Sequence, residues 1–164
     1  MAADFRHIVD RFGPGLSRVA ASYEADRALR EDLLQEILIA VHRALPSLAA
    51  EASLAPFVFR IAHNRAATHV ARRIADRRPA EQAAREPVAE REGTPEQQML
   101  ADERAERLLS AVRRLPLGYR QVITLVLEEL SYADIAEALG ISVSNVGVRV
   151  NRAKAQLKVM LDEP

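Results

Sequence analysis

The last third of the chain, residues 131–161, carries a pattern that predicts two helices joined by a short turn and packed against each other. Ser131 stands three residues before Asp134, which is the spacing of a helix N-terminal capping box. Gly140 stands where that helix must stop, because glycine tolerates the left-handed conformation of a C-cap. Ser142 can then cap a second helix. We therefore predict a helix-turn-helix in this segment.

The second of these helices is amphipathic, with an apolar side and a basic side. Its apolar residues recur at helical spacing and are expected to face the first helix: Val146, Val150, Ala153 and Leu157. Residues 145–158 contain four cations and no acid. The cations are Arg149, Arg152, Lys154 and Lys158. A short helix, a glycine turn and a basic second helix form the layout that places a recognition helix in the DNA major groove.

Composition favours an all-α fold. The chain has 164 residues, of which 49% are hydrophobic and 4% are aromatic, with only 6 glycines. Ala, Leu, Arg and Glu dominate, and these are good helix formers. There is no cysteine, which excludes disulfides and thiolate zinc sites. No run of about 18 apolar residues and no signal peptide is present, so we expect a cytoplasmic protein with no membrane insertion.

Charge is balanced overall but unevenly distributed. There are 23 basic and 23 acidic residues, which argues against strong DNA binding by the chain alone. Residues 60–78 hold six arginines and one acid, whereas residues 79–96 hold five glutamates and two arginines. The charged, proline-containing segment 79–93 is typical of a flexible linker. We therefore predict two small helical domains, residues 1–78 and 94–164, joined by a flexible acidic linker.

Helix boundaries before residue 131 follow from apolar periodicity and from capping and breaking residues. A first helix is expected to stop at Gly13-Pro14-Gly15, and Pro56 can occupy the first turn of a long helix. Thr94 with Gln97 forms a second capping-box pattern. The expected helices span residues 4–12, 16–25, 27–44, 56–77, 94–115 and 116–130.

Four motifs occur in a fixed order: D-L-x-Q-E from Asp32, R-I-A-x-N from Arg60, L-P-x-x-x-R-x-V from Leu115, and S-Y-x-x-I-A-x-x-L-G-I-S from Ser131. Their order and spacing resemble the extracytoplasmic-function sigma factors, the small two-domain members of the bacterial sigma-70 family. The resemblance covers nearly the whole chain. It implies a front domain that binds core RNA polymerase and melts and reads the −10 promoter element. It also implies a back domain that reads the −35 element.

The resemblance assigns site residues in the front domain. The residues that match D-L-x-Q-E would dock on the polymerase: Asp32, Leu33, Gln35 and Glu36. Arg60 and Asn64 match R-I-A-x-N and share a helical stripe with Ala67 and Ala71. Polar side chains among small residues suit close approach of a nucleic-acid backbone or an unstacked base, and the resemblance implies that this is single-stranded DNA at the −10 element. Arg72, Arg73, Arg77 and Arg78 would contact phosphates. The loop 46–54 matches the family's base-capturing loop in position only.

In the recognition helix, the face opposite Val146 and Val150 presents the candidate −35 contacts. These are Ser144, Gly147, Val148, Asn151 and Arg152, flanked by Asn145 and Arg149. We predict that Asn151 and Arg152 read bases, because Asn pairs with adenine and Arg with guanine. Arg149, Lys154 and Lys158 are expected to contact phosphates. Gly147 departs from the family, which commonly has a cation there.

No catalytic, metal-binding or cofactor motif occurs in the sequence, and the four histidines lack metal-ligand spacing. We therefore expect no enzyme activity, metal or cofactor, and any catalysis would belong to the polymerase. The expected partners are core RNA polymerase, promoter DNA and an anti-sigma factor. Two alternatives remain open: a stand-alone helix-turn-helix regulator, which would need a dimer and a palindromic site, and a sigma-like decoy that binds an anti-sigma factor without reading DNA.

Overall fold

A computed structural model describes residues 4–48, 53–76 and 94–163. Within these residues all regular secondary structure is helical, as predicted. The elements are α1 (Phe5–Tyr23), α2 (Arg27–Ala44), the 3₁₀ turn η1 (Leu45–Ser47), α3 (Leu54–Asp76), α4 (Pro95–Arg114), α5 (Leu117–Leu127), α6 (Tyr132–Leu139) and α7 (Val143–Asp162). The predicted linker 79–93, Arg77 and Arg78 lie outside the described residues, as do residues 49–52 of the loop 46–54.

The first helix corrects the sequence-based prediction of two helices separated at Gly13-Pro14-Gly15. It runs as one helix from Phe5 to Tyr23 with Pro14 inside it. Proline removes one backbone donor and normally breaks a helix. Here apolar residues on both sides of Pro14 are buried on one face, including Ile8 and Leu16. Tertiary packing of that shared face outweighs the local breaking signals.

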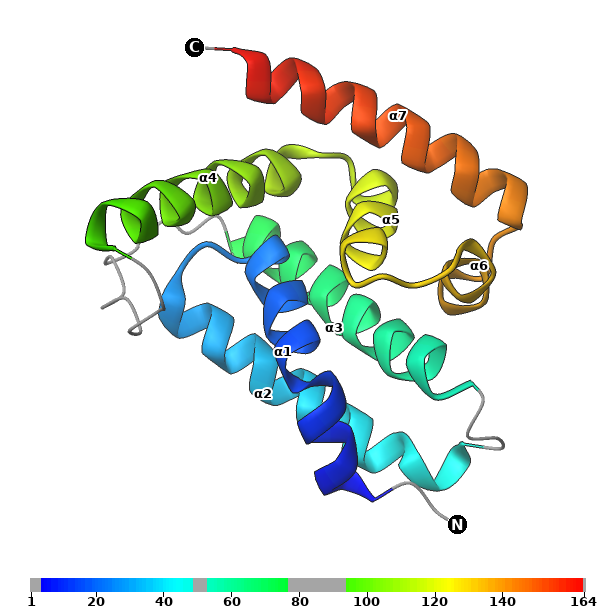
Figure 1. Cartoon of the computed structure of the whole chain (residues 1–164). Helices are drawn as coiled ribbons and strands as arrows, with labels where there is room; N and C mark the ends of the chain where they lie inside the picture. The colour runs from blue at the N-terminus through cyan, green and yellow to red at the C-terminus, as the bar shows by residue number, and fades with distance from the viewer. Residues whose placement is uncertain (1–3, 49–52, 77–93, 164) are drawn as a thin grey trace.

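Helices α1, α2 and α3 form the N-terminal half of the molecule, called the front half below (Figure 1). Helices α4 to α7 form the C-terminal half, called the back half. The bounds of α2 agree with the prediction, and the Asp26 side chain accepts a hydrogen bond from the backbone N–H of Leu29 at its N-cap. Helix α3 begins two residues earlier than predicted and keeps Pro56 in its first turn. Its buried residues include Val58 and Ala62, which are fully enclosed.

The back half confirms the predicted helix-turn-helix. The Ser131 and Ser142 side chains cap α6 and α7, and Gly140 has φ +68° between them. Val146, Val150, Ala153 and Leu157 are buried, as their spacing predicted. The Thr94–Gln97 capping box is present at the start of α4.

Helix α5 ends earlier than predicted, at Leu127. The backbone N–H of Leu130 donates to the carbonyl of Leu125, and the N–H of Glu129 donates to that of Val126. This is the Schellman pattern that ends a helix, with Glu129 at φ +64° where glycine is usual. The sequence signal was hidden because no glycine stands there.

The two halves pack directly against each other rather than standing apart. Helix α3 contacts α6, and α1 contacts α4 and α5. Figure 1 shows α5 and α6 lying over the side of α1 and α3. Buried apolar residues from both halves form one contiguous cluster, which includes Leu16 and Phe59 from the front and Leu125 and Ile135 from the back. The described residues thus share one hydrophobic core between two predicted domains.

Candidate functional site

The outer face of α7 presents most of the predicted −35 contacts to solvent. Its exposed candidates are Ser144, Val148, Asn151, Arg152 and Lys154. They lie opposite the buried stripe that packs on α5 and α6. Val148 is 45% exposed, and an apolar side chain on such a face can contact a thymine methyl group. The fold therefore gathers amide, cation and apolar groups on one accessible helical face.

Asn145 and Arg149 differ from these exposed candidates because they engage each other. The Arg149 Nε donates to Asn145 Oδ1 over 3.2 Å, and both residues are half-buried. The Arg149 guanidinium also lies against Gly118 of α5, where a Cβ atom would stand 3.1 Å from Nη1. Arg149 therefore sits between the recognition helix and α5, and less of it faces outward.

Helix α2 presents the predicted polymerase-binding residues on an exposed face, with one exception. Asp32, Gln35 and Glu36 are exposed. Leu33 is fully buried, so this residue corrects the prediction: it anchors α2 in the core and offers no surface to a partner. Ile39 lies at helical spacing from Asp32, Gln35 and Glu36 and is 52% exposed. We call Asp32, Gln35, Glu36 and Ile39 the α2 face.

Helix α3 carries the predicted −10 residues, and the structure separates them into accessible and engaged groups. Asn64 and Arg72 are exposed, and Ala67 is half-buried beside them. Arg60 is exposed as well, and its guanidinium reaches across to the other half of the molecule. Its Nε donates to the carbonyl of Ala138 over 3.2 Å, and its Nη2 donates to the carbonyl of Glu137. These carbonyls end α6, where a cation interacts favourably with the helix dipole.

Arg73 is held by an ion pair inside the front half. Its Nε lies 2.9 Å from Glu24 Oε1, and the Glu24 side chain is 5% exposed. The same carboxylate oxygen lies 2.9 Å from His69 Nε2. The Arg73 guanidinium therefore has a fixed acidic partner, which leaves Arg72 as the outward-facing cation of the predicted pair.

His63 is a buried histidine at the contact between the halves. Its Nδ1 lies 2.7 Å from the Tyr23 hydroxyl, and its Nε2 lies 3.2 Å from Thr124 Oγ1. Burial lowers the pKa of His63 to about 3 and raises that of the Tyr23 hydroxyl. The neutral ring with its proton on Nε2 satisfies every group, because Tyr23 donates to Nδ1 and Nε2–H donates to Thr124. Thr124 in turn donates to the carbonyl of Arg120 over 2.9 Å.

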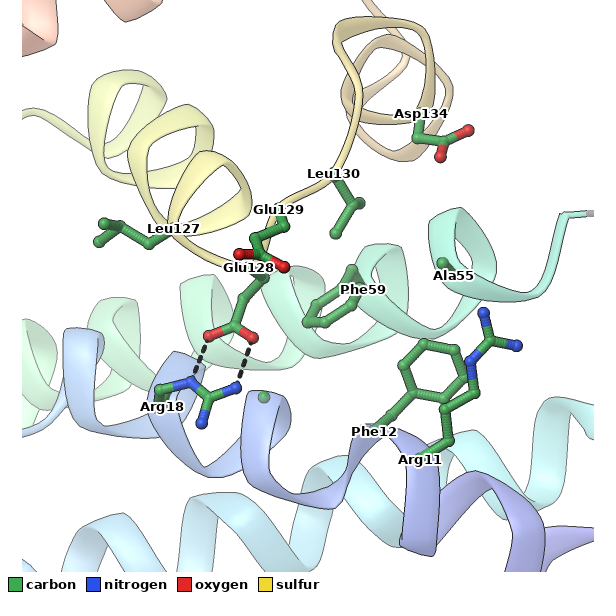
Figure 2. Close-up of a pocket in the computed structure, with 11 residues that line it drawn as sticks. Arg11, Phe12, Arg18, Ala55, Phe59, Leu127, Glu128, Glu129, Leu130 and Asp134 are labelled. Carbon is green, nitrogen blue, oxygen red and sulfur yellow. Dashed lines mark hydrogen bonds and ion pairs between the residues drawn. The ribbon is translucent and has the colours of Figure 1, made fainter.

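An ion pair also joins α1 to the end of α5. The Arg18 Nε and Nη2 atoms donate to Glu128 Oε1 and Oε2 over 2.6 and 2.8 Å. The pair borders a pocket of about 620 Å³ that is also lined by Phe12 and Phe59, and Figure 2 shows the pair together with the other lining side chains. The Glu128 side chain is 8% exposed and that of Arg18 is 64% exposed. Gly15 allows this approach, since a Cβ there would stand 2.8 Å from Glu128 Oε2.

Sequence reasoning missed the residues that join the halves. Arg18 and Glu128 stand 110 positions apart, and no local pattern links them. Arg113 of α4 is a further case, since its Nε donates to the Ala21 carbonyl at the end of α1 over 2.9 Å. Among the residues described, no group of three or more histidine, cysteine or acidic side chains is placed to hold a metal ion. None of the described helices is long and apolar enough to cross a bilayer.

Comparison with known proteins accounts for both halves. Residues 8–75 match the family Sigma-70 region 2, and residues 105–157 match Sigma-70, region 4. The RNA polymerase sigma-H factor of Pseudomonas aeruginosa is 33% identical over 134 residues, covering 76% of this chain and 68% of its own length. The ECF RNA polymerase sigma-E factor of Haemophilus influenzae is 29% identical over 164 residues, covering 94% and 85%. The chain belongs to the extracytoplasmic-function group of the sigma-70 family.

A solved sigma factor shares the fold. The sigma factor RpoE of Bartonella quintana, solved with the anti-sigma factor NepR, superposes with a TM-score of 0.74 at 22% identity, covering 98% of each chain. In the present chain, the region 2 match spans α1 to α3, and the region 4 match contains α5 and α6 and most of α7. The exposed α2 face and the stripe on α3 thus belong to region 2, and the exposed face of α7 belongs to region 4.

Proposed function

We propose that this chain is a promoter-specificity subunit that binds core RNA polymerase in the cytoplasm and has no catalytic activity of its own. The α2 face would dock on the polymerase. Asn64, Ala67 and Arg72, with Arg60, would contact single-stranded DNA at the −10 element. The exposed face of α7 would read the −35 element. An anti-sigma factor is a further proposed partner, since a sigma factor of the same fold is known with one.

The observation that carries this proposal is the presence of region 2 and region 4 in one chain, each with its own exposed polar helix face. A region 4 helix-turn-helix alone would suit many regulators. A stand-alone regulator has no use for a region 2 half with an acidic and amide surface on α2. Balanced charge also fits a protein that needs the polymerase to hold two weak DNA sites together.

Transcription with core RNA polymerase and a library of randomised promoters tests the proposal directly. We expect transcripts that depend on this protein and selected promoters that share two elements at a fixed spacing. Selection of a palindromic duplex in the absence of polymerase would instead support a stand-alone regulator. Binding to an anti-sigma factor without any promoter selection would support a decoy.

Arg152 offers a sharp test of base reading on α7. We expect Arg152→Ala to weaken binding to the selected −35 duplex by about 1–3 kcal/mol and to relax the preference at one base pair. Lys154→Ala is the matched control, since an exposed cation that contacts phosphate weakens binding on every sequence alike. Fluorescence anisotropy with single-base variants of the duplex measures both. An equal loss on all duplexes for Arg152→Ala would assign that residue to phosphate.

Gly147 is a position where binding and stability are expected to improve together. A Cβ atom there would meet only Tyr132 Cε2, at 3.8 Å, which is an ordinary contact. Inside α7, Gly147→Ala should therefore raise the free energy of unfolding by about 0.5–1 kcal/mol. Gly147→Lys should add tighter DNA binding whose dependence on log salt is steeper by about one unit. Thermal unfolding and salt titration of duplex binding separate the two effects; an unchanged salt slope would place residue 147 away from DNA.

A further inference from the structure

Cations border the outward face of α7 on both sides. Lys154 and Lys158 are exposed and stand one helical turn apart, so they share one flank of this face. Arg149 precedes Lys158 by about two and a half turns, which places it on the opposite flank. A helix in the major groove runs between two phosphate backbones. Each flank of α7 would therefore face one backbone.

Arg149 differs from the two lysines because the protein itself holds its side chain. The Arg149 Nε donates to Asn145 Oδ1 over 3.2 Å, one turn earlier on α7. A guanidinium has only donors, so the amide must turn its oxygen toward Arg149. This partner is neutral and leaves the charge of Arg149 uncompensated, whereas Arg73 is paired with the Glu24 carboxylate. Arg149 is thus fixed in place and keeps its charge for an anion.

Gly118, in the first turn of α5, provides the space in which the Arg149 guanidinium lies. A Cβ atom at residue 118 would stand 3.1 Å from Nη1 and 3.7 Å from Cζ of Arg149. The shorter distance is tighter than ordinary van der Waals contact, and the end of a long side chain moves more easily than the α5 backbone. Alanine at residue 118 would therefore displace the guanidinium from α5. Asn145 and Gly118 together fix how the Arg149 side chain lies.

The same geometry argues against Asn145 as a base reader. An asparagine that reads adenine presents both its oxygen and its amide nitrogen to the base edge. Here the oxygen is engaged by Arg149, and Asn145 is half-buried on the Arg149 flank. Asn151, in contrast, is exposed on the outward face. Of these two asparagines of α7, Asn151 is the one placed to read a base.

We propose that Asn145 and Gly118 are positioning residues, which hold Arg149 in place to bind a phosphate on one flank of the −35 duplex. The inference rests on the proposed −35 role of α7. A guanidinium that the protein already orders loses less side-chain freedom on binding than a free side chain does. Loss of this order should weaken duplex binding by about two- to tenfold. The loss should be equal on every sequence, because a phosphate contact carries no sequence information.

Double-mutant cycles in the full chain test the proposal with a randomised duplex pool at low salt. Anisotropy gives the affinity, and sequencing of the bound fraction gives the base preference. We expect Asn145→Ala and Gly118→Ala each to weaken binding by about two- to tenfold and to leave the base preference unchanged. Neither should weaken binding further when Arg149→Ala is already present. Lys158→Ala is the matched control: this cation lies on the other flank, so its effect should add in full to that of Asn145→Ala.

Nitrogen-15 NMR of the free protein reads the hydrogen bond without DNA. We expect the Nε–H proton of Arg149 to exchange slowly with water in the parent and fast in Asn145→Ala, since only the parent has an acceptor for it. Arg149→Ala identifies the resonance by removing it. Equally fast exchange in the parent and in Asn145→Ala would contradict the positioning role of Asn145.

Three results of the binding assay would overturn the proposal. Unchanged affinity in both Asn145→Ala and Gly118→Ala would show that Arg149 needs no positioning. Full additivity of Asn145→Ala with Arg149→Ala would show that Asn145 does not act through Arg149. A changed preference at one base pair in Asn145→Ala would assign Asn145 to a base. None of these readouts needs polymerase or a promoter, so failure of the proposed sigma function in the transcription assay is a separate outcome.

Discussion

Glu36→Arg is expected to lower transcription from selected promoters by about thirtyfold or more at limiting concentrations of this sigma factor. Glu36 lies on the α2 face, where an exposed isoleucine, Ile39, stands among acidic and amide side chains. An apolar group ringed by polar groups is typical of the centre of a protein interface, and loss of one such anchor costs about 2 kcal/mol or more. A cation at residue 36 also repels whatever positive surface the acid would meet.

The measurement is a titration of core polymerase with each variant, read as transcripts and as complex on a native gel. Ile39→Asp should reproduce the loss, because it removes the apolar centre of the same face. Glu103→Arg, an equal charge reversal on an exposed residue of α4, serves as the control and should transcribe normally. Thermal unfolding should be unchanged in all three, since none of these side chains is buried. Normal activity of both α2 variants would place polymerase docking elsewhere.

Acidification from pH 7.5 to 5.0 is expected to destabilise the fold by about 2 kcal/mol through His63 alone. Burial holds the His63 pKa at about 3 in the folded state, whereas the unfolded value is about 6.5. Below about pH 6.5 the unfolded chain therefore binds a proton that the folded chain does not bind. The free energy of unfolding consequently falls as the pH falls. The loss continues by about 1.4 kcal/mol per pH unit until the folded pKa is reached.

Protonation would also break the order of hydrogen-bond donors from Tyr23 through His63 to Thr124. A proton on Nδ1 faces the Tyr23 hydroxyl, which donates to that atom in the neutral state over 2.7 Å. Acid should thus weaken the contact that His63 makes between regions 2 and 4.

Urea unfolding at the two pH values, for the parent and for His63→Gln, measures the effect. Glutamine keeps hydrogen-bonding groups and has no charge, so the variant should lack the His63 part of the pH dependence. The difference between the two proteins cancels the contributions of all other titrating groups. Identical pH dependence in parent and variant would contradict the assignment of His63 as the acid-sensitive group.

The helix-turn-helix was predictable from sequence because its signals are local. Ser131, Gly140 and Ser142 each act within a few residues, and the buried stripe of α7 follows directly from helical spacing. Pro14 gave an equally clear local signal that was wrong, because burial of Ile8 and Leu16 on one face holds α1 continuous. Local rules succeed where tertiary packing agrees with them and fail where it does not.

The candidate site was predictable in type and less so in geometry. Family motifs selected the helices, and the exposed residues on α2 and α7 fit those roles. The spacing of Leu33, Ile37 and Val41 does predict a buried stripe on α2, but the family motif assigned Leu33 to the surface. The sequence could not reveal that Arg73 pairs with Glu24 across 49 positions. It also could not reveal that Arg60 reaches α6, 77 and 78 residues away. Such pairings depend on how the two halves pack, and no periodicity encodes them.

The outer face of α7 is exposed, whereas its opposite face packs on α5 and α6. Duplex DNA that binds this outer face equally well in every arrangement of the two halves shifts no population between those arrangements, however tightly it binds. A −35 element would therefore be a landing site for the protein and would not by itself change how its two halves pack.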